Sequence, residues 1–182
     1  MTRSVPTTGL IVIDMLNAYD HEDADTLTRT VERVVPRIAE LIARAKDEGV
    51  PTIYVNDNFG AWTSDRDQLL DTALQGRYRH LVEPIAPAEE ALFVVKARHS
   101  IFFQTPLEYL LGQEGIDRVV LAGQVTEQCI LYSALDAYIR HLDVAVPRDA
   151  VAHIYEHLAD ASLELMERNM SADICVADDC RL

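Results

Sequence analysis

A chain of 182 residues, 49% hydrophobic and 25% charged, can bury the core of one domain, and this composition excludes an intrinsically disordered protein. The formal net charge of −14 disfavours nucleic acid and anionic membranes as partners, because both bind through basic surfaces. No apolar run is long enough to span a membrane, the polar segment Met1–Thr8 lacks the layout of a signal peptide, and the three cysteines have no metal-binding or redox spacing. We therefore expect a cytoplasmic protein with free thiols, no nucleic-acid partner and no membrane partner.

The chain begins with a predicted strand and a long predicted helix. Gly9–Ile13 is a short apolar run rich in β-branched residues, as is typical of a buried strand, and it ends at Asp14. Apolar residues at helical spacing predict a helix over Thr26–Glu48. Pro36 within this segment predicts a kink or a division into two helices.

Two further strands are expected on either side of an irregular region. Thr52–Val55 and Ala91–Val95 are short apolar runs, and the second of them ends at Lys96. Asn56–Glu90 has the least regular pattern in the chain, and we expect it to carry a loop over the functional site.

The second half of the chain repeats the alternation of apolar runs and amphipathic segments. The apolar runs predict three more strands: Val119–Ala122, Val144–Val146 and Ile174–Val176. The amphipathic segments predict three helices: one beginning near Thr105, one over about Glu127–His141 with Thr126 as N-cap, and one over about Tyr155–Asn169.

Buried strands that alternate with amphipathic helices indicate a parallel sheet with helices on both faces. We therefore predict an α/β fold, a single doubly wound domain over residues 1–182 with a six-stranded parallel sheet. Ligands of such sheets bind beyond the carboxyl ends of the strands.

Three chemically useful residues are expected at that edge. Asp14 follows the first strand, Lys96 the third, and Cys129 lies shortly after the fourth. A helix N-terminus and a nearby lysine both favour the thiolate form of a cysteine. Asp14 can accept the thiol proton and pass it to a leaving amine, and backbone N–H groups between Val125 and Cys129 can hold an oxyanion.

Each of these residues has a structural alternative. Asp14 can cap a backbone turn, Lys96 can be a solvated residue, and Cys129 can be a small core residue. We interpret Cys175 as a core residue of the last strand and Cys180 as an exposed one.

At this point the sequence resembles the isochorismatase-like cysteine hydrolase superfamily over nearly its whole length. The Gly-x-x-Thr-x-x-Cys block after a strand is the most specific of the matching features. The blocks that carry the resemblance are Leu10–Met15, Lys96 with Ser100 and Phe102 ahead of Thr105-Pro-Leu, Gly123–Cys129, Ser133–Ala137 and Asp149-Ala150.

The resemblance implies roles and a topology. Asp14 would be the proton shuttle, Lys96 its positive partner and Cys129 the nucleophile, in a sheet of strand order 3-2-1-4-5-6. It also implies a cis peptide bond between Val125 and Thr126, which would turn backbone N–H groups toward the oxyanion. No cofactor is required.

The stretch after the second strand departs from one branch of the family. Nicotinamide-hydrolysing members usually have an Asp-x-His metal motif there, whereas Asn56–Trp62 contains no histidine, so we expect no metal. The candidate substrate-binding residues are Tyr19, Asn56, Trp62 and Gln124. The alternatives are a turn residue for Asn56 and a packing residue for Trp62. Arg98 and His99 are interpreted as a solvated loop, with anion binding as the alternative.

The leading hypothesis is hydrolysis of an amide-type carbon–nitrogen bond in a small molecule through a Cys129 thioester. One alternative is a cofactor-free ether hydrolase of the isochorismatase type, in which Cys129 is a spectator. Another is a non-catalytic binding module on the same fold. Because relatives are commonly oligomeric, we expect a homo-oligomer.

Overall fold

The predicted apolar runs form one parallel sheet in the computed structural model, which describes residues 7–182. The strand order is β3-β2-β1-β4-β5-β7, and every pair of neighbours is parallel. This confirms the predicted order, with β7 as the sixth predicted strand; a short strand that the sequence did not indicate, β6, pairs with β4. The strands are β1 (Thr8–Ile13), β2 (Thr52–Asp57), β3 (Leu92–Lys96), β4 (Arg118–Gln124), β5 (Asp143–Pro147), β6 (Val151–Ala152) and β7 (Asp173–Cys175).

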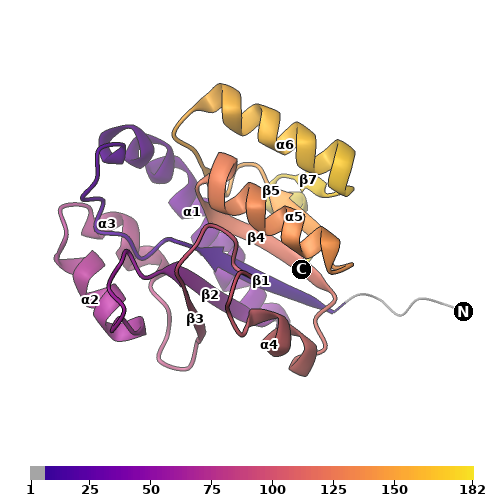
Figure 1. Ribbon diagram of the computed structural model, residues 1–182, viewed down its shortest axis with the longest axis horizontal. Coiled ribbons are helices and arrows are strands. Elements are labelled where there is room, and N and C mark those ends of the chain that lie inside the picture. Colours follow the sequence, from indigo (N-terminus) through magenta and orange to yellow (C-terminus); the bar gives the residue numbers. More distant parts are fainter. Residues whose placement is uncertain (1–6) are drawn as a thin grey trace, which may run out of the picture.

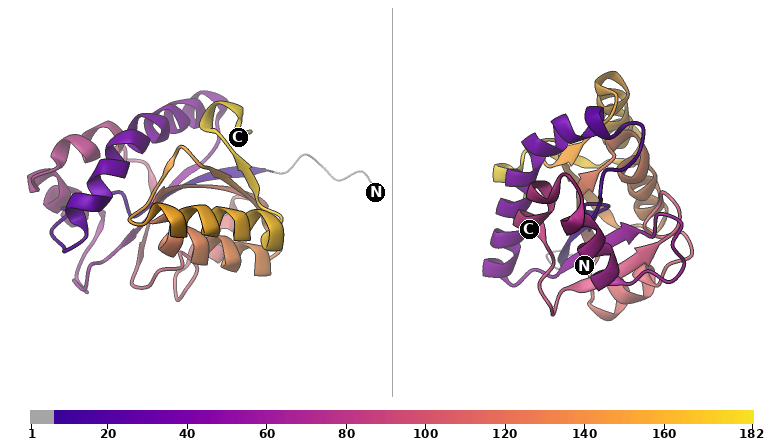
Figure 2. Two further views of the ribbon diagram at one scale, coloured as in Figure 1. Left: turned by 90° about the horizontal axis from the view of Figure 1, so that it is seen from above. Right: turned by 90° about the vertical axis from the view of Figure 1, so that its left-hand side faces the viewer.

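Helices cover both faces of the sheet, as predicted. The helix α1 lies on one face, whereas α4, α5 and α6 lie on the other (Figure 1, Figure 2). The helices are α1 (Ala24–Glu48), α2 (Arg66–Gln75), α3 (Arg79–Val82), α4 (Leu107–Gln113), α5 (Leu131–Ile139) and α6 (Glu156–Met170). The region predicted to be irregular, residues 56–90, contains α2 and α3.

The first strand, β1, is apolar without interruption because helices cover both faces of the sheet. Leu10 and Val12 pack in the core beneath α1, whereas Ile11 and Ile13 pack in the core beneath α4, α5 and α6. Alternate side chains of a strand point to opposite faces, so a strand covered on both sides needs apolar residues at every position.

Pro36 lies inside α1, which runs without a break, so of the two predicted alternatives the division into two helices is wrong. Proline has no backbone N–H and leaves the carbonyl of Glu32, four residues earlier, without its helical donor. Both Pro36 and Glu32 are exposed, and water can therefore satisfy that carbonyl.

Cys180 was expected to be exposed, but only 3% of its surface is accessible and it belongs to the core beneath α1. The segment before it folds back onto that helix, where Arg44 donates a hydrogen bond of 2.9 Å to the carbonyl of Ala177. The prediction was wrong because this contact joins parts of the chain that are distant in sequence.

In residues 7–182 no helix combines the length and apolar composition needed to cross a bilayer. The prediction about Met1–Thr8 falls largely on residues 1–6, which lie outside the described part of the chain.

Candidate active site

Asp14 is held at the carboxyl end of β1 in a left-handed conformation, with φ of 57°. Non-glycine residues rarely adopt such a conformation, and it is common at functional sites. One carboxylate oxygen accepts a hydrogen bond of 2.7 Å from the backbone N–H of Asp57, at the end of the neighbouring strand. The other lies 2.8 Å from the Nζ atom of Lys96. The carboxylate is thus held by one residue from β2 and one from β3.

Gly123, on the neighbouring strand β4, allows the close approach of the backbone next to Asp14. A side chain on Gly123 would place its Cβ atom 2.2 Å from the carbonyl oxygen of Ile13, and its φ of +122° also favours glycine. The absence of a side chain therefore lets β1 and β4 approach each other next to Asp14.

Lys96 reaches the site from β3, which is separated from β1 by β2. Its Nζ atom lies 2.8 Å from Asp14, 3.4 Å from Asp57 and 3.6 Å from the Sγ atom of Cys129. The residue is only 2% exposed. A buried ammonium needs charged partners, and Asp14 and Asp57 supply them.

Cys129 lies in a π-helical turn, Thr126–Ile130, that connects β4 to α5. Besides Lys96, which also binds Asp14, its sulfur contacts the Nδ1 atom of His99 at 3.7 Å. The structure therefore brings Asp14, Lys96 and Cys129 together, as the sequence predicted.

Burial governs the protonation of the site. Burial raises the pKa of the Asp14 carboxyl, and the charge of Lys96 offsets this effect only in part. Burial also raises the pKa of the Cys129 thiol, and the negative charge of Asp14 raises it further. Burial by itself would lower the pKa of Lys96, but the surrounding negative charges, Asp14 first among them, raise it above its ordinary value.

The site therefore favours a neutral thiol beside a Lys96–Asp14 ion pair. Burial and the charge of Asp14 raise the pKa of the Cys129 thiol, although Lys96 lowers it, as expected. An Asp14 carboxylate with a raised pKa is a stronger base for the thiol proton.

The cis peptide bond lies between Gln124 and Val125, one residue before the expected Val125–Thr126 position. Thr126 begins the π-helical turn, which requires a trans peptide bond, and the Val125 carbonyl accepts hydrogen bonds from Gln128 and Ile130 as the start of that turn. Thr126 is not an N-cap by its side chain either, because its hydroxyl donates to the Ala152 carbonyl at 2.9 Å. The role of this turn in holding an oxyanion stays a prediction.

A cavity of about 790 Å³ opens beside the cluster and is lined in part by Asp57, Trp62, Lys96 and His99. Trp62 is 83% exposed and lines this cavity, and its role in substrate binding stays a prediction.

Tyr19, Asn56 and Gln124 do not line this cavity. The Asn56 amide bonds to both the N–H and the carbonyl of Leu16, and Gln124 donates a hydrogen bond of 2.6 Å to the backbone carbonyl of Asp14. The Tyr19 hydroxyl in turn donates to Gln124 at 3.3 Å. The polar groups of these three residues thus hold the backbone around Asp14 and do not face the cavity.

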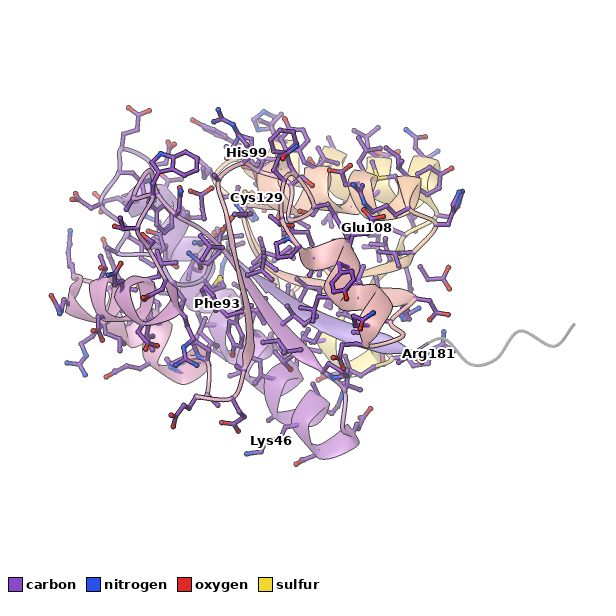
Figure 3. The ribbon with its side chains drawn as sticks, turned by 60° about the horizontal axis from the view of Figure 1, so that its bottom comes forward. Lys46, Phe93, His99, Glu108, Cys129 and Arg181 are labelled. Atoms are coloured by element: carbon purple, nitrogen blue, oxygen red, sulfur yellow. The ribbon has the colours of Figure 1, made fainter. Side chains whose placement is uncertain are left out.

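Two residues at the site, Asp57 and His99, were not among the site residues predicted from the sequence. The strand β2 extends two residues beyond its predicted end, and this places Asp57 opposite Lys96. His99 lies in the predicted solvated loop but contacts Cys129 (Figure 3). The sequence feature that could have indicated His99 is its position three residues after Lys96, a predicted site residue.

Comparison with known proteins agrees with this architecture. A family model for the isochorismatase domain matches residues 8–179. The chain is 30% identical over 166 residues to the isochorismatase family protein YaaI of Bacillus subtilis, covering 91% of this chain and 92% of that protein. It is 29% identical over 163 residues to maleamate amidohydrolase of Pseudomonas putida, covering 85% and 76% respectively. The crystal structure of N-carbamoylsarcosine amidase from Thermoplasma acidophilum matches with a TM-score of 0.76 and 26% identity, over 97% of this chain and 99% of that one.

Proposed function

The chain belongs to the isochorismatase family, and from that premise we propose that it hydrolyses an amide-type carbon–nitrogen bond of a small molecule through a Cys129 thioester. The observation that carries the proposal is the buried cluster in which Lys96 lies 2.8 Å from Asp14 and 3.6 Å from the Cys129 sulfur, at the edge of a cavity.

In the first half of the reaction the Cys129 sulfur attacks the amide carbon. Asp14 takes the thiol proton during the attack and then gives it to the departing nitrogen, so that ammonia or an amine leaves neutral. Lys96 balances the charge of Asp14 and of the sulfur as it becomes negative. These roles fit a thiol that is neutral at rest and loses its proton only in the attack.

In this proposal, backbone N–H groups of the turn from Val125 through Thr126 to Cys129 bind the negative oxygen of the tetrahedral intermediate. Free N–H groups at the start of a helix are suitable donors for a developing negative charge. Water then cleaves the thioester and releases the acid.

The names of two relatives support amide chemistry. Maleamate amidohydrolase and N-carbamoylsarcosine amidase both carry names of carbon–nitrogen hydrolases. The absence of a cofactor and the formation of a homo-oligomer stay predictions.

The test measures ammonia release from a panel of primary amides and N-carbamoyl compounds by the intact protein and by Cys129→Ala. We expect at least one compound to be hydrolysed and the variant to lose about 1,000-fold or more of that rate. Cys180→Ala is the matched control, because Cys180 is equally buried but belongs to the core beneath α1.

An activity that survives in Cys129→Ala would overturn the thioester mechanism. Cleavage of a vinyl ether that survives in that variant would support the ether hydrolase with Cys129 as a spectator. Finding neither activity, with an unreactive Cys129 thiol, would support a binding module.

A further inference from the structure

His99 is the cavity-lining residue whose imidazole contacts the sulfur, with 3.7 Å between Nδ1 and the Sγ atom of Cys129. It lies on the loop after β3, and Figure 3 shows it beside Cys129. Its exposed side chain is open to the solvent of the cavity. An uncharged imidazole nitrogen in this position can accept a proton from water next to the sulfur.

Asp14 is the buried acidic residue of the cluster and is joined to the sulfur through Lys96. It is 6% exposed and does not line the cavity. Its two carboxylate oxygens already bind the N–H of Asp57 and the ammonium of Lys96. Neither Asp14 nor Cys129 lines the cavity, so Asp14 is better placed to receive the thiol proton than to reach a water molecule that enters from the cavity.

We propose that His99 is a catalytic residue of the second half of the reaction, in which it activates the water that cleaves the Cys129 thioester. The inference rests on the proposed thioester mechanism and divides the proton transfers between two residues. Asp14 serves the formation of the thioester, and His99 serves its hydrolysis.

The step balances without a cofactor. The water oxygen bonds to the thioester carbon while one of its protons passes to the unprotonated ring nitrogen of His99. The tetrahedral intermediate then collapses, the carbon–sulfur bond breaks, and the departing sulfur receives that proton from His99. The products are a carboxylic acid and the free Cys129 thiol, with His99 returned to its starting state.

Tyr132 holds the imidazole in place. The ring centroids of Tyr132 and His99 lie 5.5 Å apart. Tyr132 follows Cys129 by three residues, so Tyr132 and Cys129 lie on neighbouring turns. We therefore assign Tyr132 as a positioning residue, which acts on the reaction through His99.

Asp57 is the competing base at the cavity. Its carboxylate lines the cavity, but one oxygen accepts the Phe59 N–H at 2.8 Å and the other faces the Lys96 ammonium at 3.4 Å. Each oxygen keeps a free lone pair, so Asp57 can also accept a proton and has to be tested beside His99. Asp57→Asn separates this possibility from the assignment of His99.

The experiment uses p-nitrophenyl acetate, a reactive ester that transfers its acetyl group to a cysteine thiol and releases p-nitrophenolate. Rapid quenching followed by intact-protein mass spectrometry gives the rates at which acetyl-Cys129 forms and disappears. We expect His99→Ala to form acetyl-Cys129 at the rate of the unmodified protein and to hydrolyse it about 100-fold more slowly.

Free imidazole added to His99→Ala should restore the hydrolysis of acetyl-Cys129, because the removed side chain leaves an opening to the cavity. Tyr132→Ala should slow the same step by a smaller factor, and Tyr132→Phe should not. His80→Ala is the matched control, since His80 is an exposed histidine whose neighbour is Glu32 of α1 at 3.9 Å.

Three results would overturn the inference. Acetyl-Cys129 could disappear from His99→Ala at the normal rate, or His99→Ala could slow only the formation of acetyl-Cys129. In the third result, Asp57→Asn slows the hydrolysis of acetyl-Cys129 and His99→Ala does not. A loss of hydrolysis that imidazole does not restore would also overturn it, since that outcome indicates a structural role. Failure of the proposed function is a separate result, in which the unmodified protein never carries an acetyl group on Cys129.

Discussion

The ammonium of Lys96 lies 2.8 Å from the carboxylate of Asp14, although a whole strand, β2, separates the strands that carry them. The lysine side chain passes the end of β2 and lies 3.4 Å from Asp57 on the way. A shorter side chain at position 96 could not make this contact, and an exposed one would gain little from it. Two measurable consequences concern the protonation of Asp14 and Cys129.

Replacing Asp14 by Asn should have opposite effects on hydrolysis and on thiol reactivity. Hydrolysis should be lost because the proton acceptor is gone. The Cys129 thiol should react faster with iodoacetamide at pH 8, because the negative charge that helps to raise its pKa is removed. Alkylation rates of the individual cysteines, read by peptide mass spectrometry, measure this, with Cys175 and Cys180 as internal controls. A slower reaction of Cys129 in this variant would contradict the role assigned to the Asp14 charge.

Replacing Lys96 by Met should destabilise the protein in a pH-dependent manner. Burial already raises the pKa of Asp14, and without the lysine that pKa rises further. A carboxyl whose pKa is raised on folding stabilises the native state below its unfolded pKa, and this contribution is lost as the pH rises through its folded pKa. Urea unfolding should therefore show a loss of about 3 kcal/mol or more at pH 8 and a smaller loss at pH 4. Equal losses at both pH values would mean that the charge of Asp14 is not responsible.

Replacing Gly123 by Ala should reduce both stability and activity. The added Cβ atom would lie 2.2 Å from the Ile13 carbonyl oxygen, so β1 must shift next to Asp14. We expect the free energy of unfolding to fall by about 3 kcal/mol. Gly112→Ala in α4 is the control, because nothing lies within 4 Å of its Cβ position and alanine favours a helix by up to about 1 kcal/mol. A variant at Gly123 as stable as the control would show that the close approach can relax.

Replacing Trp62 by Ala should change substrate binding and leave stability unaffected. Trp62 lines the cavity and is 83% exposed, so the free energy of unfolding should change by no more than about 0.5 kcal/mol. The KM for p-nitrophenyl acetate should rise severalfold, whereas Trp62→Phe should retain most of the binding because it keeps an aromatic ring. An unchanged KM in Trp62→Ala would remove this residue from the substrate-binding surface.

The sequence by itself determined the fold and the edge of the sheet at which the site lies. Apolar runs such as Gly9–Ile13 are local patterns that indicate a strand buried on both faces. The alternation of such runs with amphipathic helices indicates a parallel sheet. Asp14 and Lys96 directly follow such runs, and Cys129 follows the fourth. Their meeting at one edge could therefore be predicted without coordinates.

The tertiary structure alone decided which groups touch and how they are charged. The burial of Cys180, the extension of β2 to Asp57 and the contact of His99 with Cys129 depend on segments that are far apart in the sequence. The neutral thiol follows from desolvation, which sums the effects of all atoms around Cys129, whereas a sequence pattern records only its neighbours along the chain.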